Sequence, residues 1–405
     1  MEPPGLCRGI RILELGAGAA GPLATRYFAD QGATVVRIES SRRPDFLRLI
    51  HLRPGDPHGL DGSPMFVLMN PNKKSIRIDM SKPGGVALAR RLIGWADVVS
   101  ENFSPGVMAR WGLDAGTLRA EFPGLVIVQS CLFGQTGPER AYPGFGGQGS
   151  AIAGFNHLTG WPDRAAVGPH GTITDSLSAR YVALLIAAAL LERRRTGEGQ
   201  TIDVSQIETG VYSLSECMLR YAANAEVMVR RGNASEDAAP HGIYPCRGED
   251  RWIAIACFSD LEWRRLVRAL GDPGRLRAPR FSTLAGRLSA REKLERELSE
   301  ETRPRDAFEL MRLLQAAGIE AGVAQSYEDL LADPQLAHRG HFQVLRHRHL
   351  GELRFERQAI RPSACPPRLE APGPDLGEHT REILEDLLGL DPGETAELER
   401  REILV

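Results

Sequence analysis

The segment GIRILELGAGAAGPLATRYFADQGATVVRIE, residues 9–39, decides the fold class of this 405-residue chain. Residues 10–15 are apolar apart from Arg11 and Glu14, and they predict a short buried strand. Residues 23–31 predict a helix that ends at Gly32, and residues 34–39 predict a second strand. A strand, a helix and a strand in this order predict a parallel pair joined by a helical crossover.

The same alternation continues through the first 130 residues. Residues 83–95 predict a helix with a proline at its start, and residues 98–101 and 125–130 predict two further buried strands. Strands that alternate with helices predict an α/β fold, a Rossmann-like open parallel sheet with helices on both faces.

The remaining chain shows a different sequence pattern. Residues 176–193 predict a helix that is buried on all sides, because they are apolar nearly all round. Residues 224–250 are polar and poorly periodic, which is typical of a linker or long loop. A strand at 252–257 and charged helical patterns over 260–318 predict a second, smaller domain, and residues 378–388 predict a last helix.

Composition excludes several classes of protein. Fifty Lys and Arg against 52 Asp and Glu give a net charge of −2, so a chain-wide electrostatic attraction to nucleic acid or to anionic membrane is not expected. Six cysteines occur without a CxxC pair, which predicts buried thiols in a reducing cytoplasm and neither a disulfide framework nor a zinc site. The N-terminus lacks the pattern of a secretory signal, and the apolar run 181–191 is too short to span a bilayer.

The glycine cluster after the first strand is open to three interpretations. Gly16-Ala17-Gly18-Ala19-Ala20-Gly21 is a literal GxGxxG, and Glu39 ends the next strand, as in dinucleotide-binding proteins. Pro22 weakens this interpretation, because it removes a backbone N–H from the helix start that would hold the phosphate. A structural turn and a site for another phosphate-bearing ligand are the two alternatives.

Three loops favour a phosphate-bearing ligand. They are residues 70–76, which contain Lys73 and Lys74, residues 101–106 with Arg110 beyond them, and residues 130–138. Loops that follow parallel strands meet at the carboxyl edge of the sheet, where ligands bind. Basic side chains beside Asn and an aromatic ring suit an adenine nucleotide with phosphates, and a solvated loop or turn is the alternative for each.

Asp175 precedes the apolar helix and has two candidate roles. It could be an N-cap, whose carboxylate accepts backbone N–H bonds, or a carboxylate nucleophile that attacks a thioester and needs no histidine partner. Four histidines lie close together in sequence without metal-ligand spacing, so we interpret them as surface or loop residues; they are His338, His341, His347 and His349. GxSxG and Walker motifs do not occur, which argues against a serine hydrolase and a P-loop kinase.

Taken together, the motifs resemble the family III CoA-transferases, the superfamily of formyl-CoA transferase, carnitine CoA-transferase and alpha-methylacyl-CoA racemase. The resemblance covers almost the whole chain and is strongest at ERRRTGEGQ, residues 192–200. The other matching segments are residues 9–15, 19–22, 29–33, 36–39, 72–75, 101–103, 133–138, 203–205, 318–319, 333–335, 339–340 and 376–380.

The resemblance implies a fold, an assembly and a site. It implies a large Rossmann-like domain from residues 1–215 and 326–405, a linker and small α+β domain in residues 216–325, and an interlocked homodimer. It places the nucleophile on Asp175, with a CoA thioester as substrate, no tightly bound cofactor and no metal. The implied CoA-binding residues are Ala19, Ala20, Ile78, Asn102, Phe103 and Arg110.

Departures from the family pattern define the alternatives. Racemases of this superfamily carry a His followed by an acid where this chain has Phe145 and Gly146, and Ser104 stands where some transferases have a basic residue. Residues 233–246 show no counterpart of the glycine loop of formyl-CoA transferase, which argues against oxalate as acceptor. Some relatives are heteromers with one subunit that lacks the aspartate, so a related partner subunit is a second possibility for the assembly.

The predicted function is transfer of CoA from an acyl-CoA donor, such as succinyl-CoA, to a free carboxylic acid through an aspartyl anhydride and an aspartyl-CoA thioester. The alternatives are a 2-methylacyl-CoA racemase, an NAD-binding oxidoreductase and a non-catalytic CoA-binding subunit.

Overall fold

The chain folds into two compact units in the computed structural model, which describes residues 5–52 and 55–405. The first unit combines residues 5–52, 55–157, 167–228 and 338–405, and the second combines residues 158–166 and 229–337. The division differs from the boundaries at 216 and 325 inferred from sequence, since α10 (Ser215–Asn224) lies in the first unit and residues 158–166 lie in the second.

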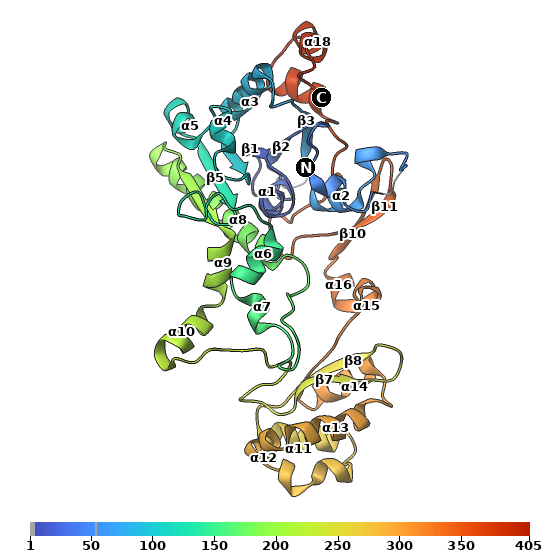
Figure 1. Cartoon of the computed structure of the whole chain (residues 1–405). Helices are drawn as coiled ribbons and strands as arrows, with labels where there is room; N and C mark the ends of the chain where they lie inside the picture. Colours follow the sequence, from blue (N-terminus) through green and yellow to red (C-terminus); the bar gives the residue numbers. More distant parts are fainter. Residues whose placement is uncertain (1–4, 53–54) are drawn as a thin grey trace. The chain divides into compact units, whose positions relative to one another are not determined.

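A six-stranded sheet forms the centre of the first unit (Figure 1). Its order is β3-β2-β1-β4-β5-β6 and every pair is parallel, so the predicted Rossmann-like fold class is confirmed. The strands are β1 (Arg11–Leu15), β2 (Thr34–Glu39), β3 (Lys74–Arg77), β4 (Val98–Glu101), β5 (Val126–Cys131) and β6 (Thr201–Ser205).

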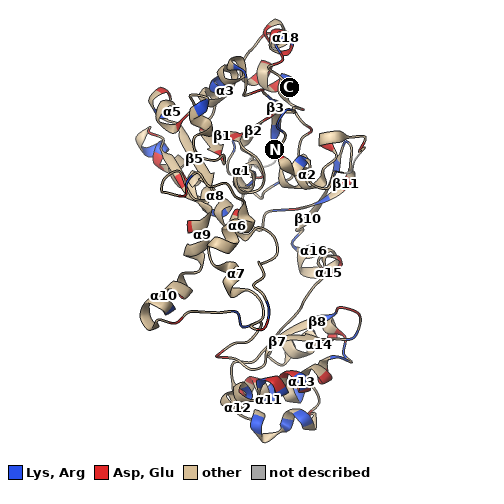
Figure 2. Cartoon of the chain, in the orientation of Figure 1, with Lys and Arg blue, Asp and Glu red and all other residues tan. Residues whose placement is uncertain are grey.

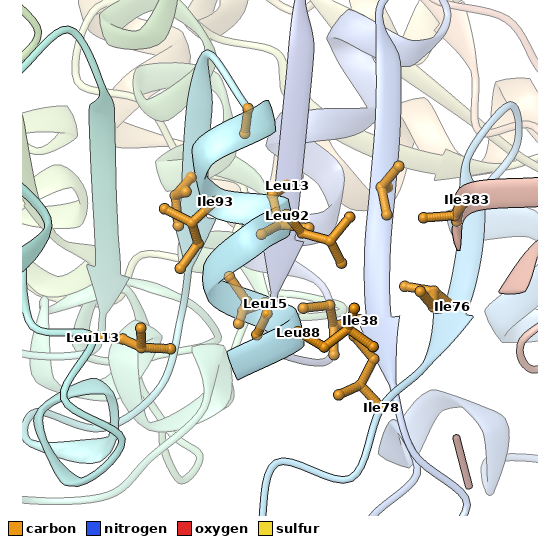
Figure 3. Packing of buried hydrophobic residues seen from close by; sticks show 14 of the residues in the cluster. Leu13, Leu15, Ile38, Ile76, Ile78, Leu88, Leu92, Ile93, Leu113 and Ile383 are labelled. Atoms are coloured by element: carbon orange, nitrogen blue, oxygen red, sulfur yellow. The ribbon is translucent and has the colours of Figure 1, made fainter. Parts of the chain in front are cut away.

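Helices cover both faces of this sheet, because its strands are apolar on both sides. On one face α3 (Pro83–Trp95) packs against β1, β2 and β3 through Leu88, Leu92 and Ile93 (Figure 3). On the other face α1 (Ala20–Ala29) and α8 (Ile173–Thr196) pack together over Ile12 and Val128. The first unit also contains α2 (Pro64–Met69), α4 (Val107–Arg110), α5 (Ala115–Glu121), α6 (Gly146–Ile152) and α9 (Gln206–Ser213). Two short helices, α7 (Phe155–Leu158) and α16 (Pro334–His338), lie where the chain passes between the units.

The C-terminal segment completes the first unit. The hairpin of β10 (Phe342–His347) and β11 (Gly351–Glu356) is followed by α17 (Thr380–Glu382), a wider helical turn at Ile383–Leu387, and α18 (Pro392–Arg400). Ile383 and Ile403 pack into the core under α3. The prediction that residues 378–388 form the last helix is wrong, because Asp391 and Glu394 form a capping box that starts α18.

The second unit has its own core around an antiparallel sheet of order β7-β8-β9. The predicted linker over residues 224–250 contains β7, because pairing with β8 stabilises a strand that its own weak pattern does not indicate. Charges of both signs follow one another along α11 and α13 (Figure 2). The elements are β7 (His241–Pro245), β8 (Trp252–Ala256), β9 (Glu320–Val323), α11 (Asp260–Ala269), α12 (Leu284–Ser289), α13 (Arg291–Thr302), α14 (Ala307–Ala316) and α15 (Tyr327–Ala332).

Helix α8 is longer and less buried than its sequence predicts. Its middle carries no charge (Figure 2), yet Leu184 is 65% exposed and Leu191 is 70% exposed. The expectation of a helix buried on all sides is therefore wrong for this single chain. By length and composition α8 could also cross a membrane, but one such helix is weak evidence, because core helices of soluble proteins meet the same criteria.

A buried ionic cluster lies beneath the glycine-rich turn that follows β1. Its centre is Arg37 on β2, which is fully buried and donates to Glu14 Oε1 at 2.7 Å and to the backbone oxygen of Gly16 at 3.2 Å. Arg37 also donates to Asp45, whose carboxylate accepts the backbone N–H of Gly18. The cluster thereby fixes both ends of the turn.

Three more charged side chains complete this cluster. Glu39 accepts two bonds of 2.9 Å from Arg48, and Lys73 Nζ donates to Glu14 Oε2 at 2.8 Å. Burial alone disfavours ionisation of Glu14, but Lys73 and Arg37 hold its pKa below the usual value. Three carboxylates thus balance three cations, and the loop 70–76 supplies a member of this cluster rather than a ligand contact.

We expect Arg37→Met to destabilise the first unit by about 3–5 kcal/mol, since it leaves Glu14 and Asp45 buried without their shared partner. Urea titration followed by tryptophan fluorescence measures the shift. The matched control is Arg400→Gln, which removes an exposed pair with Glu397 and should leave the midpoint unchanged. Equal midpoints for Arg37→Met and wild type would contradict the role given to the cluster.

Candidate active site

Asp175 lies in the first turn of α8. The helix begins at Ile173 with Thr172 as its N-cap residue, so Asp175 is the third helical residue and not the N-cap that one interpretation of the sequence proposed. A carboxylate in the first turn is favoured by the partial positive charge of the helix N-terminus. The Asp175 carboxylate does not cap α8. Two of its three hydrogen-bond donors belong to other helices, Gly146 to α6 and Gln206 to α9.

Three donors surround the Asp175 carboxylate. It accepts hydrogen bonds from the side chains of Thr172 and Gln206 and from the backbone N–H of Gly146. The residue is 9% exposed, and burial raises the pKa of its carboxyl despite these three donors. The site therefore holds a partly dehydrated carboxylate whose direction is fixed by hydrogen bonds.

Gly146 permits this close approach. A Cβ atom at position 146 would lie 2.5 Å from Asp175 Oδ2 and 2.8 Å from the Thr172 Cβ. Real Cβ atoms do not approach other atoms so closely, so any side chain at the start of α6 would displace the carboxylate.

Asp175 opens into a cavity of about 460 Å³ at the carboxyl edge of the sheet. This volume lies in the range of small-ligand sites. Four of the six predicted CoA-binding residues line it together with Asp175: Ala19, Ala20, Asn102 and Phe103. The structure thus brings the glycine-rich turn, the end of β4 and the start of α8 to one cavity.

A second cavity of about 540 Å³ lies beside the first. Ile78 and Arg110 line this second cavity, and Ala17 and Phe103 line both. All predicted CoA-binding residues therefore lie on two cavities that share a boundary.

Asn102 and Phe103 are held in place by hydrogen bonds. Asn102 donates to the backbone oxygen of Ala17 at 2.7 Å and accepts from its N–H at 3.1 Å, so the amide group braces the glycine-rich turn. The Phe103 N–H donates to Glu101 at 2.8 Å. Burial raises the pKa of Glu101 to about 7.

Two features of this region differ from a dinucleotide site. Glu39, the acid expected to bind a ribose hydroxyl, is buried and already accepts bonds from Arg48 and from the Ser75 hydroxyl at 2.7 Å. Pro22 is the third residue of α1, so the first turn of that helix has one backbone N–H fewer to offer a phosphate.

The sequence interpretation missed several residues of the two cavities. Arg42 and Arg43 follow β2 and line the second cavity, and their signal was a pair of basic residues directly after a strand. Gln206 begins α9 directly after β6. Arg140 lies after β5, where the sequence offered no pattern that distinguishes it from an ordinary turn.

The histidine region differs in part from its interpretation. His347 ends β10 and is buried, so the assignment of all four histidines to the surface or to loops is wrong for this residue. Asp61, His349 and Asp375 place potential metal-ligand atoms within 4.8 Å of one another. Both carboxylates are already paired, Asp61 with Arg48 at 3.0 Å and Asp375 with Arg348 at 3.2 Å, which disfavours a cation there.

Comparison with known proteins assigns the family. Residues 7–380 match the model of CoA-transferase family III. The chain belongs to this family.

Relatives extend over the whole length of this family III CoA-transferase. It is 35% identical over 405 residues, all of this chain and 99% of the relative, to succinyl-CoA–D-citramalate CoA-transferase from Chloroflexus aurantiacus. It is 32% identical over 95% of its length, and 96% of the relative, to succinate–glutarate CoA-transferase from Agrobacterium fabrum. A crystal structure of a CAIB/BAIF family protein from Brucella suis superimposes with a TM-score of 0.87 at 31% identity, and the match covers 95% of this chain and all of that one.

Within this family III enzyme, we expect Gly146→Ala to reduce CoA transfer by at least ~100-fold, because the added Cβ displaces the Asp175 carboxylate by more than the tolerance of a reacting geometry. Transfer is measured by chromatography of acyl-CoA products from succinyl-CoA and a panel of carboxylic acids.

The neighbouring Gly147→Ala is the matched control. Position 147 lies on the same helix, and a Cβ there meets nothing within 4 Å. Both variants gain the same helix propensity, so a comparable loss in both would show that the contact with Asp175 is not the cause.

Proposed function

We propose that this enzyme transfers CoA from succinyl-CoA to a second dicarboxylic acid, with Asp175 as the group that carries the acyl chain and then CoA. The observation that carries the proposal is the buried Asp175 carboxylate, fixed by three hydrogen-bond donors at the wall of a cavity that reaches the glycine-rich turn. A carboxylate is ionised near neutral pH and needs no general base.

The first half-reaction transfers CoA to the enzyme. Asp175 attacks the thioester carbonyl of the donor, the C–S bond breaks, and CoA thiolate leaves behind a mixed anhydride. The thiolate then attacks the aspartyl carbonyl of the anhydride, which releases the donor acid and forms an aspartyl-CoA thioester.

The second half-reaction repeats these steps in reverse with another acid. The acceptor carboxylate attacks the aspartyl thioester and displaces CoA thiolate, which gives a second anhydride. The thiolate attacks the acceptor carbonyl, the new acyl-CoA forms, and the Asp175 carboxylate is regenerated. Charge and atoms balance at each step without a redox or metal cofactor.

The residues around Asp175 suit these steps. The Gly146 N–H and the side chains of Thr172 and Gln206 orient the carboxylate and can donate to oxygen atoms that develop negative charge. Low exposure of Asp175 protects an anhydride or thioester from water.

The two cavities share lining residues, and we propose that they hold the two ends of one CoA thioester. In the proposal the nucleotide end occupies the second cavity, where Arg43 and Arg110 offer positive charge to phosphates. The pantetheine arm passes Ala17 and Phe103, which line both cavities, and the sulfur reaches Asp175.

The substrate class comes from the two relatives. Their names specify succinyl-CoA or succinate with citramalate or glutarate. Succinate, citramalate and glutarate all carry two carboxyl groups, so we propose a dicarboxylic donor and a dicarboxylic acceptor here.

We also propose a homodimer. Large apolar side chains are exposed on α8, α9 and α10 of the single chain, a surface that a monomer rarely leaves in water; they are Leu184, Leu185, Leu191, Tyr212, Met218, Leu219 and Tyr221.

Sedimentation velocity should therefore give about twice the chain mass of 44.4 kDa. Replacement of Tyr212 and Leu219 by Glu should lower this mass, because charge at an apolar interface opposes association. A monomer at micromolar concentration in the wild type would contradict the homodimer, and a requirement for a related second chain would replace it by a heteromer.

Asp175→Asn should abolish transfer from succinyl-CoA, with a loss of at least ~1,000-fold, because an amide neither attacks a thioester nor forms an anhydride. Hydroxylamine added during turnover should convert Asp175 of the wild type to a hydroxamate, seen by peptide mass spectrometry. Asp386→Asn, at an exposed position in the first unit, is the control. Full activity of Asp175→Asn, or exchange of an α-proton in deuterated water without an acceptor acid, would reject the transferase mechanism.

The raised pKa of Asp175 fixes the sign of two pH effects. Since the free carboxylate is required, kcat/KM should fall toward acid pH with an apparent pKa above the ordinary value of about 3.9. The folded state prefers the protonated acid, so the stabilising contribution of the protonated form is lost as pH rises through the raised pKa. At pH 7.5 Asp175→Asn should therefore unfold at a temperature no lower than wild type.

A further inference from the structure

The cavity around Asp175 has an unusual distribution of charge. Of the side chains that line it, all described residues, one is a carboxylate, Asp175, and one is a cation, Arg140. The others are apolar or neutral polar groups. An acid that presents one carboxyl group to Asp175 and carries a second one therefore has one cation available in this cavity.

Arg140 lies in the chain between β5 and α6. Its backbone N–H donates to the Gly137 oxygen at 3.4 Å, and the Tyr142 N–H donates to the Glu139 oxygen at 2.9 Å. The Tyr142 ring contacts Phe133 edge to face at 6.1 Å, which anchors this turn to the residues that follow β5.

The guanidinium of Arg140 is not committed to another group of the chain. The residue is exposed, and no carboxylate of residues 5–52 and 55–405 lies within 4.0 Å of its side-chain nitrogens. By contrast, Arg37 pairs with three carboxylates and Arg48 pairs with two; the partners of Arg37 are Glu14, Glu39 and Asp45, and those of Arg48 are Glu39 and Asp61.

We propose that Arg140 binds the distal carboxylate of the dicarboxylic substrate and makes the enzyme selective for dicarboxylic over monocarboxylic acids. The proposal rests on the function proposed above and adds its specificity-determining residue. A guanidinium matches a carboxylate by two parallel N–H···O bonds, so it selects both charge and planar shape.

Two aromatic rings in the wall of this cavity suit an aliphatic linker. Phe46 and Phe145 meet edge to face with ring centroids 5.5 Å apart, and both line the same cavity as Asp175 and Arg140. Short methylene chains such as those of succinate and glutarate can lie against these rings. One carboxyl group then faces Asp175 and the other faces Arg140.

A CoA phosphate is the other anion that could occupy Arg140. Arg140 lines the cavity of Asp175 and not the second cavity, which is lined by four other arginines, Arg37, Arg42, Arg43 and Arg110. The distribution of arginines thus separates one cation near Asp175 from four in the neighbouring cavity.

The test compares wild type, Arg140→Gln and Arg140→Lys with glutarate and with valerate, which has the same number of carbons and lacks the second carboxylate. We expect Arg140→Gln to lower kcat/KM for glutarate ~10–100-fold, mainly through KM, and to leave valerate unchanged. Arg140→Lys should retain part of the activity with glutarate, since it keeps the charge and loses the paired geometry.

The control is Arg400→Gln, on α18. Equal losses with glutarate and valerate, or a rise in the KM for CoA thioesters of monocarboxylic acids, would overturn the role of Arg140 in carboxylate recognition. If wild type transfers CoA to no acid at all, the proposed function fails separately. Calorimetric titration of glutarate and valerate into the CoA-saturated protein then tests the role of Arg140 separately. Equal glutarate affinity in wild type and Arg140→Gln would reject that role.

Discussion

A buried arginine on β2 holds the carboxyl edge of the sheet in place. Arg37 connects Glu14 on β1, the backbone of Gly16 in the glycine-rich turn, and Asp45 after β2. Buried ion pairs are poor stabilisers on average, since dehydration offsets much of their attraction. Their value here is geometric: the glycine-rich turn has few side chains of its own, so its position must come from groups beneath it.

The position of this turn determines the rest of the site. Asn102 binds both backbone groups of Ala17, and a Cβ at Gly16 would lie 1.8 Å from the Asn102 amide oxygen, so turn and β4 end fit each other only with glycine at position 16. Phe103 then stands where the two cavities meet. On the face of the sheet opposite α3, α1 packs against α8, which carries Asp175. The ionic cluster and the Asp175 carboxylate are thus linked through packed elements of one unit.

The sequence predicted the parts of this arrangement that local pattern controls. Residues 10–15, 34–39 and 98–101 are short apolar runs between turns, and all became strands of the parallel sheet. It failed where partners distant in the chain decide. The Lys73 loop carries basic residues, but Glu14, 59 positions earlier, draws Lys73 into the interior. Residues 241–245 are weakly periodic and become a strand because β8 pairs with them. Arg140 had no local signal, since its significance depends on which other charges share its cavity.

The orientation of the Asp175 carboxylate depends on the absence of a side chain at position 146. An acid or base at this position would need a Cβ, and that atom would lie 2.5 Å from Asp175 Oδ2. With Phe at position 145, 61% exposed, the start of α6 offers no titratable group to move a proton at an α-carbon. It offers a backbone N–H instead, which donates to the carboxylate. A site built in this way suits a carboxylate that attacks, accepts an acyl group and is regenerated, and the geometry that permits this chemistry is the same one that excludes a racemase-type acid and base pair at positions 145 and 146.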